Sequence, residues 1–162
     1  PLAPDNAWGI IQGLETAPLR MKQHCSNAEK AVDFLKKHKN VERVIYPTLH
    51  EGEIAARSKK YFKGGNGALV GIEVKGGVEA GKKFIESLKM FYHVANIGDA
   101  RSLAIHPATT THSQLTEEEL LAAGVTPGYV RLSIGIEHPD DIIADLDQAL
   151  NQSGKPNLKA VG

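Results

Sequence analysis

The segment Tyr129-Val-Arg-Leu-Ser-Ile-Gly-Ile136 decides how this chain folds, because its side chains alternate between two chemically different faces. Val130, Leu132, Ile134 and Ile136 share one face of an extended strand, and Tyr129, Arg131, Ser133 and Gly135 share the other. A period of two with apolar residues on one side predicts a strand that covers a hydrophobic core with a single face.

The rest of the chain divides into helical and extended segments around this strand. Apolar periodicity predicts helices near 5–14, 16–37, 54–61, 78–88, 116–123 and 139–150, and further strands at 41–46, 68–74 and 91–97. This order predicts an α+β fold of the α/β sandwich type, with a sheet of about four strands backed by helices. We expect linking helices at 1–38, one domain at 39–151 and a loose tail at 152–162.

Local signals suggest several boundaries. Thr116 followed by Glu119 is a capping box. Asp5 and Thr16 are expected to cap the first two helices, of which the second is amphipathic and about twenty residues, or roughly 30 Å, long. Gly71 inside a strand indicates either a bulge or a close approach of another group.

The first helix carries Trp8, Ile11 and Leu14 on one face. The chain opens Pro-Leu-Ala-Pro without an initiator methionine, so we expect it to be part of a longer protein. If the segment that covers this face is missing, the face is exposed and promotes self-association.

Composition excludes several classes of protein. The 162 residues are 41% apolar and 23% charged, as in ordinary globular chains, and 19 basic residues balance 19 acidic ones. This balance argues against a nucleic-acid or anionic-membrane partner. No apolar run is long enough for a membrane span, and there is no signal-peptide pattern. The single cysteine, Cys25, favours a reducing, cytoplasmic location.

Residues 96–115 form a connector that is unusually rich in hydroxyl, charged and imidazole groups. Polar residues this dense beside apolar strands line binding sites more often than they simply connect elements. We therefore expect this stretch to form one wall of a site. Asp99 and Arg101 are two residues apart, and a simple ion pair between them is the alternative interpretation.

Arg131 lies in the middle of an apolar strand, and its same-face neighbours Ser133 and Gly135 are too small to cover it. A guanidinium in a shallow hollow suits bidentate capture of a carboxylate or phosphate. The pattern alone favours the alternative, an arginine on a solvated sheet face that pairs with a surface acid.

Other residues suggest less. The spacing of His93, His106, His112 and His138 matches no zinc pattern, so satisfied or exposed histidines are expected and no metal site is predicted. Cys25 lies on the apolar stripe of the long helix and is interpreted as a packing residue rather than a nucleophile. The residues by themselves assemble no complete catalytic constellation.

Several motifs together resemble one family. They are Gly-Leu-Glu-Thr-Ala-Pro-Leu-Arg-Met at 13–21 with His24 and Asn27-Ala28, Gly-Asp-Ala-Arg-Ser-Leu-Ala-Ile-His-Pro at 98–107, Thr110-Thr111-His112, and Val130 to Glu137. In this order they resemble the C-terminal part of the Cys/Met-metabolism family of pyridoxal-phosphate enzymes, which have fold type I. The resemblance runs from about Pro4 to Leu150 and is nearest to the branch that replaces the acetate of O-acetylhomoserine with sulfide.

The resemblance implies roles for four residues. Arg131 matches the family arginine that binds the substrate carboxylate, and the main chain of Ser102 is expected to help hold that carboxylate. Thr111 and Arg101 are expected in the same substrate site. Related cystathionine lyases and synthases commonly have glutamate at the position of Arg101, which separates the branches. The implied parent is a cytoplasmic homo-oligomer, a tetramer by resemblance.

The family's Schiff-base lysine, phosphate-binding residues and pyridine-nitrogen aspartate have no counterpart here. Lys59 and Lys60 fall in a predicted surface helix. We therefore expect the chain to be inactive alone, with no catalytic residue and no cofactor-binding residue of its own. The pyridoxal phosphate and the missing N-terminal cofactor domain would belong to the parent. Cystathionine γ-synthase or γ-lyase chemistry, or a non-catalytic amino-acid-binding or interaction module, are the alternatives.

Overall fold

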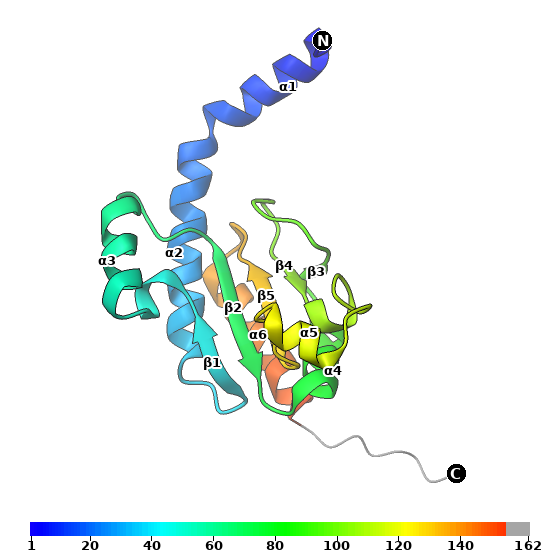
Figure 1. Ribbon diagram of the computed structural model, residues 1–162. Helices are drawn as coiled ribbons and strands as arrows, with labels where there is room; N and C mark the ends of the chain where they lie inside the picture. Colours follow the sequence, from blue (N-terminus) through cyan, green and yellow to red (C-terminus); the bar gives the residue numbers. More distant parts are fainter. Residues whose placement is uncertain (155–162) are drawn as a thin grey trace.

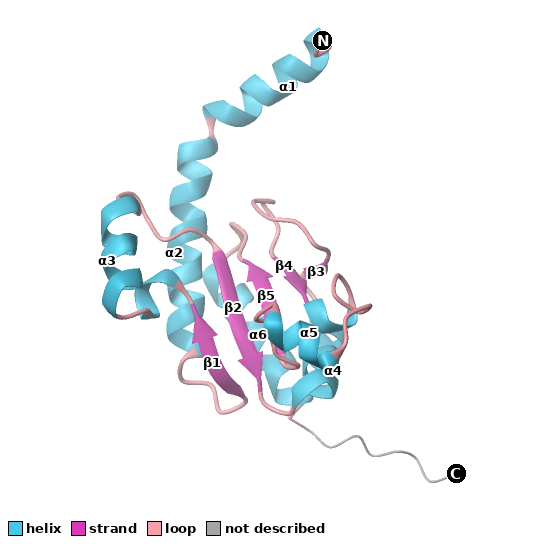
Figure 2. Ribbon diagram, in the orientation of Figure 1, coloured by secondary structure: helices cyan, strands magenta, loops and turns pink. Residues whose placement is uncertain are grey.

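The computed structural model describes residues 1–154, without the side chain of Glu117, and contains a five-stranded sheet in the order β1-β2-β5-β4-β3 (Figures 1 and 2). The strands are β1 (Val41–Ile45), β2 (Leu69–Val74), β3 (Tyr92–His93), β4 (Leu103–Ile105) and β5 (Tyr129–Ser133). All neighbouring pairs are antiparallel except β3 and β4, which are parallel. The fold is α+β, as predicted.

Helices cover one face of this sheet. The α-helices are α1 (Pro4–Glu15), α2 (Ala17–Leu35), α3 (Gly52–Tyr61), α4 (Gly77–Ser87), α5 (Glu117–Ala122) and α6 (Pro139–Ser153), and two short 3₁₀ helices are η1 (Pro47–Leu49) and η2 (Pro107–Thr109). Helix α6 packs between α2 and α4, and both of these contact the sheet (Figure 2). The core lies between these three helices and the apolar face of β5, whose Val130 and Leu132 are fully buried.

The predicted third strand is wrong in length, and one strand was missed. Only Tyr92 and His93 of 91–97 are extended in the sheet, while β4 lies inside the stretch predicted to be a loop. The buried carboxylate of Asp145 accepts hydrogen bonds from the backbone N–H groups of residues 89–91, which bends the chain as it enters β3. Strand β4 has only three residues, all buried, and so short an apolar run has no readable period.

The sheet ladder also ends earlier than predicted, at Ser133. Ile134 donates its N–H to Ala68, and Ile136 donates its N–H to Ala100. The alternation of faces continues in the sequence through Ile136, but these two bonds go to loops rather than to a strand. The predicted strand at 129–136 is therefore correct in its first five residues.

The boundary predictions were partly correct. The capping box of Thr116 and Glu119 is confirmed. Asp5 is not a cap, because it lies in the first turn of α1 after Ala3. Thr16 does precede α2, but its hydroxyl accepts a hydrogen bond from the Arg20 side chain and makes no capping bond. The close approach at Gly71 is confirmed, since a Cβ there would lie 2.8 Å from the Tyr129 ring.

Helix α1 extends away from the body of the domain and buries none of its residues (Figure 1). Trp8, Ile11 and Leu14 are 67%, 55% and 63% exposed, as the sequence predicted. Helix α6 runs to Ser153, into the predicted tail, and the remainder of that tail, 155–162, lies outside the described residues. No helix within 1–154 is long and apolar enough to cross a membrane.

Gly81 in α4 provides a test of this packing. A Cβ at Gly81 would lie 2.6 Å from the imidazole Nε2 of His106, whose ring is held on both sides by hydrogen bonds. Gly81→Ala should lower the free energy of unfolding by about 1–3 kcal/mol, measured by urea denaturation. Gly13→Ala is the matched control, because Gly13 is also in a helix but a Cβ there would have no other atom within 4 Å. The control should be neutral or slightly stabilising, and equal effects of the two substitutions would contradict the packing argument.

Candidate functional site

Arg131 lies at the centre of β5, on the sheet face that α2, α4 and α6 do not cover. Its register partners are Gly71 on β2 and Ile105 on β4. The half-buried guanidinium donates one long hydrogen bond, 3.5 Å from Nη2, to the carbonyl oxygen of Asn96. No carboxylate of residues 1–154 forms an ion pair with it, so the pairing with a surface acid that the sequence left open is not found there.

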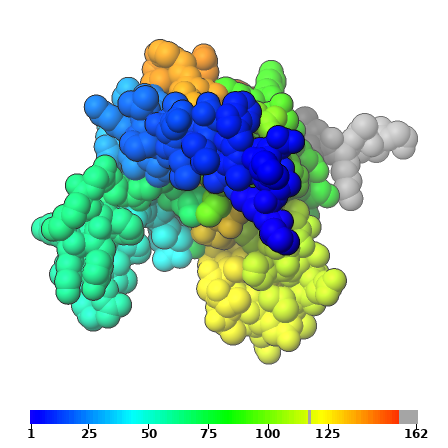
Figure 3. All heavy atoms as spheres, turned by 90° about the horizontal axis from the view of Figure 1, so that it is seen from above, coloured from blue at the N-terminus to red at the C-terminus, as the bar shows by residue number. Residues whose placement is uncertain are grey.

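The uncovered face forms the floor of a hollow. Seen from above, α3 and the segment around α5 project in the same direction, at some distance from each other, and the surface is recessed between them (Figure 3). A cavity of about 450 Å³ opens at one end of this face. It is mainly apolar and is lined by Met21, His24, Pro47, Phe62, residues 66–69, Ile97, Gly98 and Ser133. Arg131 is not among these lining residues, but Ser133 is its next neighbour on the same face of β5, so the cavity lies beside the arginine along the strand.

Ser102 is fully buried, and its hydrogen bonds go to Glu137 and Gly135 rather than to Arg131. Its backbone N–H donates to Glu137 Oε1 at 2.6 Å, and its hydroxyl donates to Glu137 Oε2 at 2.9 Å. The same Oγ accepts from the N–H of Gly135 at 2.9 Å. The main-chain N–H that the resemblance assigned to a substrate carboxylate is therefore already bonded to Glu137 in this structure, and the assigned role stays a prediction.

Arg101 and Thr111 also have partners of their own. The Arg101 guanidinium stacks over the Tyr92 ring, 4.3 Å from its centroid, and its Nε lies 3.4 Å from Asp99 Oδ1. The hydrogen bond to Arg101, chiefly from its backbone N–H, lowers the pKa of Asp99. The exposed Thr111 hydroxyl lies 2.8 Å from His112 Nδ1. The alternative interpretation of Asp99 and Arg101 as a local pair is confirmed.

The structure thus does not bring the four predicted substrate residues into one contact network. It places beside Arg131 a residue to which the sequence assigned no role, Asn96. The signal was available in part, because Asn96 begins the polar stretch and is followed by Gly98, which adopts a φ of 74°. A carbonyl that contacts a side chain 35 positions away leaves no pattern in the sequence.

A second set of contacts that the sequence did not predict joins α2 to the segment after β5. His24 Nδ1–H donates to the carbonyl of Ile134 at 2.7 Å, and the Asn27 amide donates to the carbonyls of Gly135 and Glu137 at 3.0 and 2.8 Å. Both side chains are almost fully buried. They bond backbone groups that would otherwise be unpaired where the strand ends.

The buried imidazole of His106 is held by two hydrogen bonds. Pro127 can only accept a hydrogen bond, so His106 Nε2 carries the proton at 2.8 Å, and Nδ1 accepts from the Thr109 hydroxyl at 2.9 Å. Burial lowers the pKa of His106, against the opposing effect of the Pro127 carbonyl. Among the described residues no group of three or more His, Cys, Asp or Glu side chains is placed to bind a metal ion.

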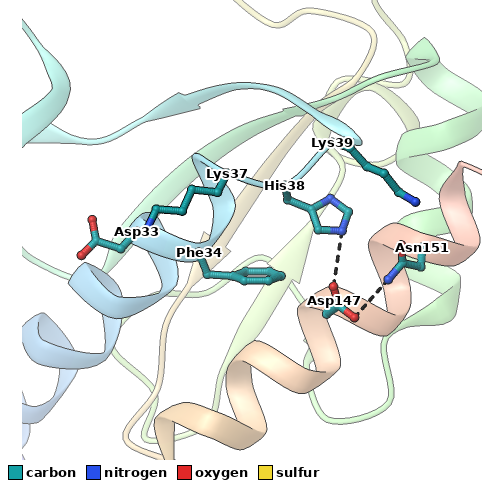
Figure 4. Close-up of a pocket in the computed structure, with 7 residues that line it drawn as sticks. All are labelled: Asp33, Phe34, Lys37, His38, Lys39, Asp147 and Asn151. Atoms are coloured by element: carbon teal, nitrogen blue, oxygen red, sulfur yellow. Dashed lines mark hydrogen bonds and ion pairs between the residues drawn. The ribbon is translucent and has the colours of Figure 1, made fainter.

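A separate cavity of about 520 Å³ lies at the helix layer, between the end of α2 and α6 (Figure 4). There His38 Nε2 lies 3.4 Å from Asp147 Oδ1, and Asn151 donates to the same carboxylate. His38 Nδ1 accepts from the N–H of Asn40, and burial lowers the pKa of His38. These bonds join the end of α2 to α6, and none of them involves the predicted substrate residues.

Comparison with known proteins adds independent findings. The model of the Cys/Met metabolism PLP-dependent enzyme family matches residues 1–151. An O-acetyl-L-homoserine sulfhydrylase of Leptospira meyeri is 57% identical over 92% of this chain and 34% of its own length. An L-methionine gamma-lyase of Fusobacterium nucleatum subsp. polymorphum is 49% identical over 93% of this chain and 38% of its own.

A solved structure agrees with these relatives. A protein of Campylobacter jejuni subsp. jejuni assigned as an O-acetylhomoserine (thiol)-lyase superposes with a TM-score of 0.84 at 47% identity, over 93% of this chain and 36% of its own, and carries N'-pyridoxyl-lysine-5'-monophosphate. This chain spans about a third of the length of the curated relatives that it matches.

The buried His106 should make stability depend on pH. Its pKa is lowered in the folded state and is about 6.5 in the unfolded state. The unfolded state therefore binds more protons at acid pH. The stabilising effect of the neutral His106 on the folded state is complete above about pH 6.5 and declines as the pH falls below that value. His38 acts in the same direction. His106→Gln should flatten, but not abolish, the fall in unfolding free energy between about pH 6.5 and 5, measured by urea denaturation.

The control for this measurement is His50→Gln, at a partly exposed histidine outside these contacts. It should keep the wild-type pH dependence. An unchanged slope in His106→Gln would show that His106 is not the group that titrates.

Proposed function

The chain belongs to the Cys/Met metabolism family of pyridoxal-phosphate-dependent enzymes, and on that premise we propose that Arg131 binds the carboxylate of the amino-acid substrate in the complete enzyme. The supporting observation is a partly buried arginine on an uncovered sheet face, whose hydrogen-bond partner among the described residues is the neutral carbonyl of Asn96. Burial of a cation costs free energy unless an anion pairs with it. The planar guanidinium can form two parallel hydrogen bonds to a carboxylate.

The activity that we propose for the complete enzyme is O-acetylhomoserine sulfhydrylation. Sulfide replaces the acetate of O-acetylhomoserine, which gives homocysteine and acetate, a step of methionine biosynthesis. The similarity to the Leptospira meyeri sulfhydrylase and to the Campylobacter jejuni structure supports this choice. The cofactor supplies the electron sink for this chemistry when it is bound.

The described residues do not fit a complete pyridoxal-phosphate site. The cofactor is held covalently by a lysine in the Campylobacter jejuni structure. The cavity beside Arg131 has no lysine in its lining, and Lys59 and Lys60 are exposed on α3. We therefore propose that the lysine and the phosphate site belong to another part of the complete enzyme, and no step through the cofactor is assigned to this chain.

In this proposal residues 39–151 form the substrate-binding domain, and 1–38 link it to the cofactor domain. The exposed apolar face of α1, with Trp8, Ile11 and Leu14, fits a segment that packs against other parts of the protein. The complete enzyme is proposed to be a cytoplasmic homo-oligomer. Ser102, Thr111 and Arg101 keep a proposed place near the substrate, with Arg131 as the residue that contacts its carboxylate.

A second candidate activity is favoured by one comparison. The Fusobacterium nucleatum methionine gamma-lyase is 49% identical to this chain, below the Leptospira meyeri sulfhydrylase at 57% but level with the Thermus thermophilus sulfhydrylase at 48%. Incubation of the complete enzyme with O-acetylhomoserine and sulfide, and separately with methionine, distinguishes the two activities. Homocysteine formation in the first reaction supports the proposal, and methanethiol release from methionine as the main activity would replace it. A cystathionine synthase or lyase would show its preference with cystathionine or cysteine, and a non-catalytic module would turn over none of these.

Arg131→Lys in the complete enzyme tests the assigned contact. Lysine keeps the charge but loses the bidentate geometry, a contact worth roughly 1.5–3 kcal/mol. The KM for O-acetylhomoserine should rise about 10- to 150-fold, measured by steady-state kinetics at saturating sulfide. Arg43→Lys is the control, because Arg43 pairs with Glu73 and lies on β1, which β2 separates from β5. An unchanged KM in Arg131→Lys would remove this residue from the site.

The 162-residue chain alone should not retain the cofactor. After incubation with pyridoxal phosphate and dialysis, its visible absorbance should disappear, because no lysine of the described residues lines the cavity beside Arg131. Borohydride treatment followed by intact-mass analysis checks for a covalent adduct. A stoichiometric adduct on one lysine would contradict the proposed division of the site.

A further inference from the structure

The loop from Val94 to Ser102 runs alongside β5 and its extension, and polar contacts join the two segments at successive positions. The carbonyl of Asn96 accepts from Arg131, and the N–H of Gly98 donates to Ser133 Oγ at 3.4 Å. Further along, the carbonyl of Ala100 accepts from the N–H of Ile136, and Ser102 bonds Gly135 and Glu137. The loop therefore follows the strand from the arginine to the glutamate.

Apolar packing contributes little to holding this loop. Residues 92–98 are all exposed, including Val94 at 47% and Ile97 at 56%. The first two contacts of the series are long, at 3.5 and 3.4 Å, whereas the contacts at Ser102 are short, at 2.6 and 2.9 Å. The strong attachment of the loop is thus at Glu137, and its weak end is the part that contacts Arg131.

Glu137 accepts hydrogen bonds from both donors of Ser102. The Ser102 N–H donates to one carboxylate oxygen and the O–H donates to the other, while Oγ also accepts from the N–H of Gly135. Glutamine at this position has one acceptor oxygen and one amide N–H₂ group, which would have to donate to the remaining lone pair of Ser102 Oγ. The Ser102 O–H would then lose its acceptor on residue 137.

The position of the glutamate is itself constrained. The Asn27 amide bonds the Glu137 carbonyl, and a Cβ at Gly135 would lie 2.2 Å from Glu137 Oε2. The Asn27 bond ties the backbone of Glu137 to α2, and the absence of a side chain at Gly135 leaves the space that the carboxylate occupies. Glu137 is therefore anchored to α2 and can transmit a fixed position to the loop.

We infer that Glu137 is a positioning residue for substrate binding: it fixes the loop 96–102 through Ser102, and through that loop the orientation of the Arg131 guanidinium. This inference rests on the proposed role of Arg131. Glu137 itself touches neither the arginine nor a substrate. Its effect is to reduce the freedom of the guanidinium before the carboxylate arrives, so that less ordering is required on binding.

The experiment is Glu137→Gln in the complete enzyme, with steady-state kinetics for both substrates. The KM for O-acetylhomoserine should rise about tenfold, while kcat and the KM for sulfide change less than about twofold. The reason is that carboxylate binding acts equally on the ground state and the transition state. Ser102→Ala, which keeps the N–H contact to Glu137, should raise the same KM by a smaller factor, and it serves as the second variant if Glu137→Gln does not fold.

Glu73→Gln is the matched control, because Glu73 is a partly buried glutamate of the same sheet that pairs with Arg43 and Thr126. It should lower the unfolding midpoint and leave the KM for O-acetylhomoserine unchanged. A KM increase in Glu73→Gln as large as that in Glu137→Gln would mean that general destabilisation is the cause, and would overturn the inference.

A double-mutant cycle separates this inference from the proposed function. If Glu137 acts through Arg131, then Glu137→Gln should add little to the KM of Arg131→Lys, whereas additive effects would overturn the inference. If Arg131→Lys raises KM and Glu137→Gln does not, the positioning role fails and the proposed function stands. If Arg131→Lys leaves KM unchanged, the proposed function fails, and with it the route through Arg131.

Discussion

The structure depends on how the backbone is bonded where β5 leaves the sheet. After Ser133 the carbonyls of the strand no longer have a neighbouring strand, and an unpaired buried carbonyl is costly. His24 and Asn27 of α2 bond three of these carbonyls. The long helix is thereby attached across the end of the sheet, and the segment that follows β5 becomes a rigid support instead of a free loop.

Two consequences of that support reach the candidate site. Glu137 is oriented toward Ser102, which holds the polar loop beside the strand. The loop then presents the Asn96 carbonyl, and no acid, to Arg131. The contrast with Arg101 is informative, since that guanidinium is occupied by Asp99 and Tyr92. Of these two arginines, Arg131 is the one without an ionic partner in the described chain, which is why we propose it as the receptor for the substrate carboxylate.

The fold was more predictable than the site. Helices and long strands have a period that a sequence displays, so α2, β2, α4 and α6 were found close to their true bounds. Strand β4 was missed because three residues cannot show a period. The substrate roles of Ser102, Thr111 and Arg101 stay predictions. Their hydrogen-bond partners were not predictable where they lie far away in sequence, as Glu137 and Gly135 do for Ser102. Asn96 and Glu137 were not given roles for the same reason.

The sequence by itself determined that this chain folds as a helix-backed sheet, that Arg131 lies on the face away from the core, and that its motifs are those of the Cys/Met metabolism family. Alternation and motif order are local properties, so they survive without coordinates. Only the tertiary structure decided which polar groups are already paired. Hydrogen bonds between residues 30 to 110 positions apart pair Glu73 with Arg43, Ser102 with Glu137, and Arg131 with a neutral carbonyl instead of an acid. Such bonds depend on distance in space and not on spacing along the chain, so the sequence could not show them.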